Sequence, residues 1–292
     1  MPYEPGVRIL AAALIPAIFF VASTASTSKV EAQRRRDLPK GPTAKTQSVC
    51  GTKILPLVEG NRWTYGFVQT AALPPPELTK LIPSQPGQIV ITVKSIETRG
   101  TDTVVTLEEK TTADISRDPK KHIIDERTIT STITCNRTKF EISPESFFFA
   151  GEPGGYFGLT LEKLERPKDT TWKLINGMIG EAEWREDIIA RFTRQGFEGT
   201  GAKLDSGKLE LERKFTPAQP ENINTKVGVY TAEKLAITTT GRVTLDHPQP
   251  DTKAMELPAG WVNFLWIAPN VGVIQVLNAY AHQYQLIEVA LK

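Results

Sequence analysis

Hydrophobic and polar residues alternate with a period of two along most of the chain. Trp63, Tyr65 and Phe67 are separated by small or polar residues, and residues 89–94 repeat the alternation. Successive side chains of a strand point to opposite faces of a sheet, so this period predicts strands with one buried and one solvated face. Residues 99–102 are expected to form a hairpin turn, because the alternation resumes directly beyond them.

Residues 128–135 give the clearest prediction of a strand. Four threonines share one parity, while Ile129 and Cys135 belong to the other. Threonine is β-branched and its hydroxyl tolerates water, so the threonine face is expected to be solvated. The same alternation predicts further strands at residues 208–215 and 235–245.

Residues 181–193 fit two patterns. Trp184, Ile188 and Phe192 have helical spacing, with acids early and arginines late, as a helix prefers. The segment divides more cleanly by parity, because five of six residues on one face are apolar and six of seven on the other are polar. We therefore predict a strand.

No shift in composition divides the chain beyond residue 48, so residues 49–292 are predicted to form a single antiparallel β domain. Proline-rich stretches bracket a loop at residues 73–87, which is expected to hold a helical turn at residues 77–81 and could act as a flap. The predicted fold class is mainly β. One large antiparallel sheet is curved into a half-open barrel or a β-sandwich, with few short helices.

The N-terminus has the three-part pattern of a secretory signal peptide. Arg8 precedes an uncharged run at residues 9–22, and small polar residues follow it. These fourteen residues are short for a bilayer span, which needs about 20. We predict a signal peptide at residues 1–25, or extending to Ala32, and export to the periplasm or cell envelope. The alternative is an uncleaved N-terminal anchor.

Charge is distributed unevenly along the chain. The chain has 35 basic and 33 acidic residues, a net charge of +2, and residues 29–45 alone carry +4. The charges of residues 1–28 cancel, which leaves a net charge of −2 for residues 47–292. Residues 26–48 also lack an apolar period, so we predict a flexible basic tether, whose run Arg34-Arg35-Arg36 could touch anionic lipid headgroups.

This charge distribution limits the expected partners. A mildly acidic body gives no reason to expect nucleic acid, because phosphate binding needs clustered cations on the folded surface. Membrane contact is expected only through the N-terminal segment, if that segment is not cleaved.

Cys50 and Cys135 are the two cysteines of the chain. In an oxidising compartment an even cysteine count suggests pairing, and we predict a disulfide. Closing a loop of this length contributes roughly 4 kcal/mol in the chain-entropy model. The alternative is two unrelated buried thiols, since Cys135 has the parity of the predicted buried face.

Three motifs resemble a broad group of secreted bacterial β-proteins. They are Gly60-Asn61-Arg62-Trp63-Thr64-Tyr65 in the opening segment, the turn and strand at residues 227–235, and the closing hairpin Trp266-Ile267-Ala268-Pro269-Asn270-Val271-Gly272. The middle motif departs from the group's usual valine and proline before the glycine. The resemblance implies a half-open antiparallel barrel like that of the envelope lipoprotein carriers, and no catalytic residue. Gly60 and Asn270 also suit tight turns with positive φ.

The sequence contains no recognisable catalytic or metal-binding motif. Gly-x-Ser-x-Gly, His-Glu-x-x-His, Cys-x-x-Cys and phosphate-binding glycine patterns are absent, so no metal or cofactor is expected. The best carboxylate cluster comprises Glu181, Glu183, Glu186 and Asp187. Only Glu186 has the parity of the apolar face, so we expect it to be buried, with an arginine such as Arg213 as a candidate partner.

We therefore predict a non-catalytic binding protein whose concave, aromatic-rich face holds an apolar ligand, such as a lipid, or a partner segment. The candidate ligand-binding residues are Trp63, Tyr65, Phe67, Trp184, Phe192 and Trp266. Phe147, Phe148 and Phe149, with Tyr156 and Phe157, add aromatic side chains in a glycine-rich loop region. An aromatic stripe is nevertheless more often core than ligand site.

Two other functions fit the sequence. One is an accessory or structural subunit of a membrane-associated envelope complex, which would use sheet edges or the proline-rich loop as its contact surface. The other is a secreted hydrolase that depends on Glu186.

Overall fold

The computed structural model describes residues 39–70, 86–114, 120, 122–151, 159–165, 172, 174–194, 205–246, 256–279 and 281–292. Within these ranges the chain forms a 12-stranded antiparallel sheet and a separate two-stranded hairpin. The order in the large sheet is β5-β4-β3-β2-β1-β14-β13-β12-β11-β10-β9-β6, with β5 and β6 at its two edges. The sheet is therefore open, and the predicted fold class is confirmed.

The strands of the large sheet are β1 (Arg62–Thr70), β2 (Gln88–Arg99), β3 (Asp102–Asp114), β4 (Ile124–Cys135), β5 (Phe140–Ile142), β6 (Leu159–Glu165), β9 (Trp184–Arg194), β10 (Asp205–Thr225), β11 (Gly228–Leu245), β12 (Glu256–Ala268), β13 (Gly272–Leu277) and β14 (His282–Ala290). The small hairpin pairs β7 (Leu174–Ile175) with β8 (Met178–Ile179). Two helices are described, η1 (Val49–Gly51) and α3 (Phe147–Ala150).

The parity patterns predicted the strands correctly. The ambiguous segment forms β9, a strand, and the predicted turn joins β2 to β3. In β4 the inward residues Ile133 and Cys135 are buried, as expected. Gly60 and Asn270 both have positive φ, 86° and 58°, which confirms that they form tight turns.

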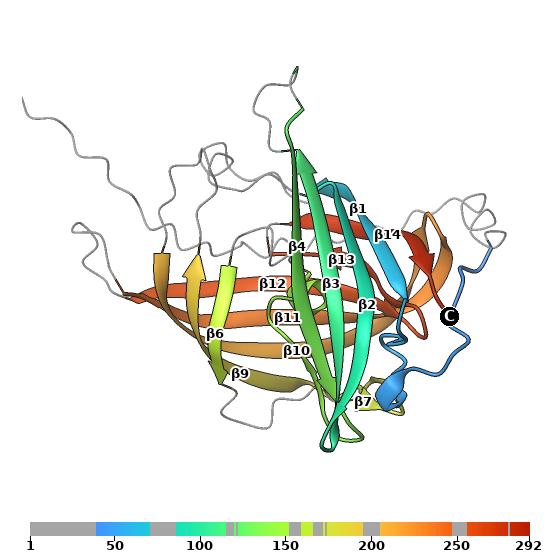
Figure 1. The fold of residues 1–292 in the computed structure, drawn as a ribbon, viewed down its shortest axis with the longest axis horizontal. Coiled ribbons are helices and arrows are strands. Elements are labelled where there is room, and N and C mark those ends of the chain that lie inside the picture. The colour runs from blue at the N-terminus through green and yellow to red at the C-terminus, as the bar shows by residue number, and fades with distance from the viewer. Residues whose placement is uncertain are drawn as a thin grey trace, which may run out of the picture.

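The sheet curls so that its two ends approach each other. Figure 1 shows β2–β4 running steeply across the direction of β9–β12. The ring of Trp172 lies between the two ends. Its centroid is 6.1 Å from the ring centroid of Phe140 on β5 and 5.6 Å from that of Phe215 on β10. We call the enclosed face, which carries Trp63 and Leu107, the concave face. Cross-strand ion pairs such as Lys94–Glu108 cover much of the opposite, convex face.

The prediction of a flexible tether is wrong for residues 39–48. Lys40 forms a bridge with Val229, and the amide of Ala44 donates to the carbonyl of Asn270. The amides of residues 45 and 46 both donate to the carbonyl of Lys292. These contacts use backbone groups, so they leave no periodic side-chain pattern in the sequence.

Several predictions lie outside the described residues. They concern residues 1–38, the flap at residues 73–85, Tyr156 and Phe157, and the side chain of Phe192. Among the described helices, none has the length and apolar character needed to cross a membrane.

Candidate functional site: the concave face and its phenylalanine plug

The aromatic residues of β1 form the floor of the concave face. Trp63 and Tyr65 are fully buried. The indole N–H of Trp63 donates to the carbonyl of Val271 over 2.6 Å, and the hydroxyl of Tyr65 donates to that of Val273 over 2.7 Å. Both polar atoms are therefore satisfied inside the core, as buried Trp and Tyr usually require. Their rings remain available for apolar contacts.

A short segment, residues 146–151, covers this floor, and we call it the plug. Its helix α3 has four residues, Ser146 at its N-cap and left-handed Gly151 at its C-cap. A single helical turn is unstable in isolation, so packing must hold it in place. The ring centroid of Phe147 lies 4.8 Å from that of Tyr65, and Phe148 lies 5.5 Å from Trp63.

The buried carboxylate of Glu109, on β3, holds the N-terminal end of the plug. Oε1 accepts hydrogen bonds from the hydroxyls of Ser131 and Ser146, over 2.5 and 2.6 Å, and Oε2 accepts from the amide of Phe147 over 2.8 Å. Burial raises the pKa of Glu109, and the three donated hydrogen bonds offset part of that rise. The side chain of Glu109 is only 2% exposed.

The guanidinium of Arg213, on β10, holds the other end of the plug. Its Nη2 donates to the carbonyl of Phe149, and its Nη1 donates to Oε2 of Glu186 over 3.1 Å. The guanidinium carbon lies 3.5 Å from the ring centroid of Phe149. The expectation that Glu186 is buried and paired with Arg213 is confirmed, because the two residues are 2% and 1% exposed.

The two ends of the plug are therefore bound by opposite halves of the sheet. In the strand order, β3 is the third strand from one edge and β10 the third from the other. The plug connects them through the amide of Phe147 and the carbonyl of Phe149.

The other predicted ligand-binding residues occupy three different environments. Trp184 stacks on Phe215 with ring centroids 4.7 Å apart, on the concave face. Its indole N–H is buried and has no acceptor among the described residues. Phe67 is half-buried and packs edge-on against Tyr284.

Trp266 does not belong to the concave face. Its neighbour Leu265 faces the concave core beside Leu235, so Trp266 faces the other way, beside Lys234. Its indole N–H donates to Glu221 over 3.0 Å, and the ammonium of Lys234 lies 5.0 Å from its ring. Grouping it with the concave aromatic residues was therefore wrong, because register, and not residue type, decides the face.

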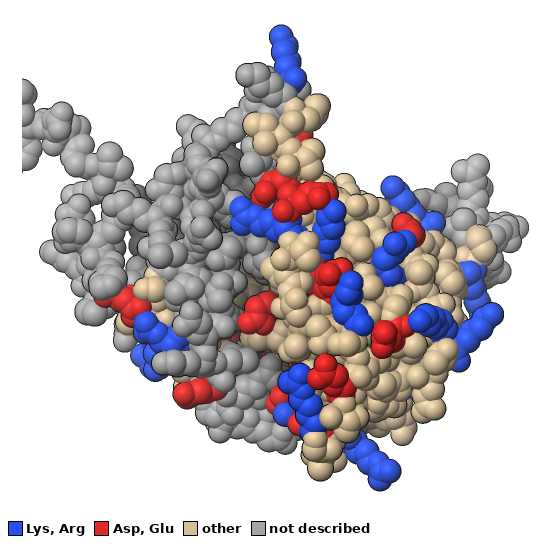
Figure 2. All heavy atoms as spheres, in the orientation of Figure 1, with Lys and Arg blue, Asp and Glu red and all other residues tan. Residues whose placement is uncertain are grey.

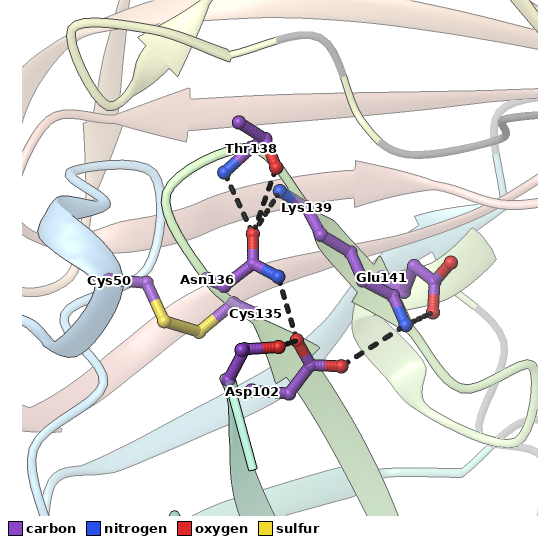
Figure 3. A network of polar contacts seen from close by, with 8 residues as sticks. Cys50, Asp102, Cys135, Asn136, Thr138, Lys139 and Glu141 are labelled. Atoms are coloured by element: carbon purple, nitrogen blue, oxygen red, sulfur yellow. Dashed lines mark hydrogen bonds and ion pairs between the residues drawn. A yellow bond between two sulfur atoms is a disulfide. The ribbon is translucent and has the colours of Figure 1, made fainter.

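The disulfide between Cys50 and Cys135 is confirmed, and it joins η1 to the end of β4. Figure 3 shows a polar network beside it, centred on Asn136. The amide nitrogen of Asn136 donates to Asp102 over 2.7 Å, and its oxygen accepts from the amide of Lys139 over 2.8 Å. The hydrogen bond from Asn136 lowers the pKa of Asp102. The network fixes the turn into β5.

The acidic cluster of β9 is divided between the two faces. Glu183 lies on the convex face, where hydrogen bonds from Lys214 and Thr216 lower its pKa. Glu186 points inward and is bound to Arg213. No group of three metal-binding side chains occurs among the described residues. The cluster does not therefore provide two carboxylates that face one cleft, which glycoside hydrolysis needs.

A shallow depression of about 620 Å³ lies over β9, β10 and β11. It is lined by Asp187, Glu210, Glu212 and Arg242 among others. Glu210 pairs with Arg242, and Glu212 pairs with Arg185. Ile188, Ile189 and Leu211 also line the depression, so it combines apolar side chains with these ion pairs.

The sequence analysis noted the aromatic run Phe147–Phe149 but missed Glu109 and the helical turn that seats the plug on the concave face. Glu109 has a usable signal, since it follows Val105 and Leu107 on the apolar parity of β3, as Glu186 does on β9. The plug has no such signal, because three consecutive phenylalanines show no period.

Comparisons with known proteins identify no family. No family model matches the chain, and no curated protein is similar to it. A candidate lipoprotein from Parabacteroides distasonis, solved by crystallography, is similar with a TM-score of 0.49 and 14% identity. A candidate exported protein with a YmcC-like fold from Bacteroides fragilis has a TM-score of 0.45 and 12% identity. Each comparison covers 82% of this chain and 99% of the other.

Proposed function

We propose that this chain is an exported, non-catalytic binding protein whose concave face takes up an apolar ligand. One observation carries the proposal: the concave face already binds an apolar segment that belongs to no strand. Phe147 and Phe148 are fully buried against Trp63 and Tyr65. A surface complementary to these rings suits another apolar group of similar width.

The plug has the properties of an exchangeable occupant. It is one helical turn, and it adds no strand to the sheet. Each buried phenylalanine contributes about 1.5–3 kcal/mol. An incoming ligand that covers the same rings replaces this apolar contact, so the exchange is limited mainly by the hydrogen bonds to Glu109 and Arg213.

Export is supported by two features of the chain. The N-terminal pattern is that of a signal peptide, and the paired cysteines Cys50 and Cys135 suit an oxidising compartment. A non-catalytic role is supported by Glu186, whose carboxylate is occupied by Arg213.

Binding of the fluorescent apolar probe 1-N-phenylnaphthylamine tests the proposal. Ser146→Ala removes the N-cap of α3, which contributes about 1 kcal/mol, so we expect about fivefold tighter probe binding than in the wild type. Thr130→Ala, on the exposed parity of β4, is the matched control and leaves affinity unchanged. Absence of probe binding, together with no lipid released on organic extraction, contradicts the proposal.

A second function, as a subunit of an envelope complex, is favoured by the outer edge of β4. Residues 124–131 of β4 have no strand on that side among the described residues. Ile123 and Ile124, where β4 begins, are 53% and 57% exposed. Unpaired strand edges bind added strands. A stoichiometric partner recovered from solubilised membranes, and lost in Ile124→Asp, supports this function, whereas recovery of a monomer alone contradicts it.

A further inference from the structure

Five exposed lysines form no ion pair in the described part of the chain. They are Lys40, Lys45, Lys53, Lys226 and Lys292. Lysines elsewhere behave differently, since Lys94, Lys110, Lys139, Lys208, Lys214 and Lys234 each pair with a carboxylate. The unpaired lysines are therefore distinguished by position and not by residue type.

Backbone contacts bring these lysines to one end of the molecule. The amide of Lys45 donates to the carbonyl of Lys292. The amide of Asn270 donates to the carbonyl of Lys53, and its own carbonyl accepts from Ala44. A Cβ on Gly228 would lie 2.4 Å from the Cα of Gly41, so the turn that contains Lys226 lies directly against the segment that contains Lys40. We call the surface that carries these five lysines the basic end.

The basic end contains little acidic charge. In residues 39–60, 225–229, 268–272 and 289–292, which form it, Glu59 is the single acidic side chain. Its backbone carbonyl accepts a hydrogen bond from the ammonium of Lys292. Figure 2 shows blue side chains gathered along the margin where Figure 1 places the C-terminus, whereas blue and red are interspersed over β2–β4.

We propose that the basic end is a docking surface for an anionic lipid bilayer. The chain itself points to this occupant. Arg34, Arg35 and Arg36 precede Pro39 by three to five residues, so covalent geometry keeps them within about 18 Å of the basic end. Lipid headgroups at this surface would meet the lysines of the folded domain together with the arginines.

Vesicle partitioning of the full chain tests this proposal. The measured quantity is the ratio of binding to vesicles with 30 mol % phosphatidylglycerol over binding to pure phosphatidylcholine. This ratio cancels any contribution of the apolar N-terminal run. Each lysine near an anionic surface contributes a factor of about five, so replacing the five unpaired lysines with glutamine is expected to lower the ratio at least about 100-fold.

The control variant replaces five ion-paired lysines, Lys94, Lys110, Lys139, Lys208 and Lys214, with glutamine. It has the same change in net charge and is expected to keep the wild-type ratio. An equal fall in both variants, or no fall in the first, overturns the proposal. If the variant without the five unpaired lysines still binds vesicles but is no longer retained on immobilised poly-L-glutamate, the proposal is also overturned. The surface would then be assigned to an acidic protein.

A salt titration of the wild-type chain needs no variant. The ratio is expected to fall toward one between 50 and 500 mM NaCl, because salt at these concentrations screens exposed charges over about 4–14 Å. A ratio independent of salt contradicts electrostatic docking.

Discussion

Glu109 and Glu186 are both inward-facing carboxylates that are 2% exposed, yet the core accommodates them in different ways. Glu186 is bound to a buried cation, Arg213. Glu109 faces two hydroxyls and one amide, and no cation contacts it among the described residues. The C-terminal end of the plug is therefore held by a charge pair, and the N-terminal end by an acid whose burial disfavours ionisation.

This difference determines how each end responds to a change of charge. Removing one partner of a buried ion pair leaves an uncompensated charge, which is strongly destabilising. Removing the charge of an unpaired buried acid relieves desolvation and keeps its shape. The same substitution, glutamate to glutamine, should thus have unequal effects at the two positions.

Glu186→Gln is expected to have the larger effect. It leaves the guanidinium of Arg213 buried without a counter-charge, which lowers the free energy of unfolding by about 3–5 kcal/mol, measured by urea denaturation at pH 7. Glu212→Gln is the control, because Glu212 forms an exposed pair with Arg185 and should change stability by less than about 1 kcal/mol. Equal losses of stability in Glu186→Gln and Glu212→Gln would show that the buried ion pair contributes no more than an exposed one.

Glu109→Gln is expected to be milder and to change the pH dependence of stability. The pKa of Glu109 is raised above its ordinary value of 4.5 in the folded state. The stabilisation that the protonated carboxyl of Glu109 gives the folded state is thus fully present below about pH 4.5. It is lost as pH rises through the folded-state pKa. In paired denaturation series, the wild type should lose stability relative to Glu109→Gln as pH rises above about 4.5. The opposite trend would mean that the carboxylate is stabilised by charge, as Glu186 is.

Ser146→Ala is expected to have the smallest effect of the three. It removes the hydroxyl that caps α3 and donates to Glu109, at a cost of about 1 kcal/mol in thermal or chemical denaturation. A loss above about 3 kcal/mol would show that the N-terminal end depends on this hydroxyl as strongly as the other end depends on its ion pair.

Parity in the sequence predicted the strands and one of the two buried acids. Trp184, Glu186 and Ile188 follow the alternation of β9, and register with β10 places Arg213 opposite Glu186. Glu109 follows the same rule on β3, so it was predictable in principle.

The plug was not predictable, because its position depends on contacts distant in sequence. Phe147 is bound by Glu109, 38 residues earlier, and Phe149 by Arg213, 64 residues later. The basic end was concealed for a related reason. A net charge of −2 for residues 47–292 sums over lysines that the fold pairs with acids and lysines, such as Lys53, that it leaves unpaired.

Amide hydrogen exchange with and without 1-N-phenylnaphthylamine tests the central claim most directly. The amides of Phe147, Phe149 and Gly151 hydrogen-bond to Glu109, Ser146 and Phe147 in the seated plug. If an apolar ligand displaces the plug, these three amides exchange faster when the probe is bound, while those of β1 and β13 keep their protection. Unchanged or slower exchange in residues 147–151, at saturating probe, would contradict the claim that the plug and the ligand compete for the concave face.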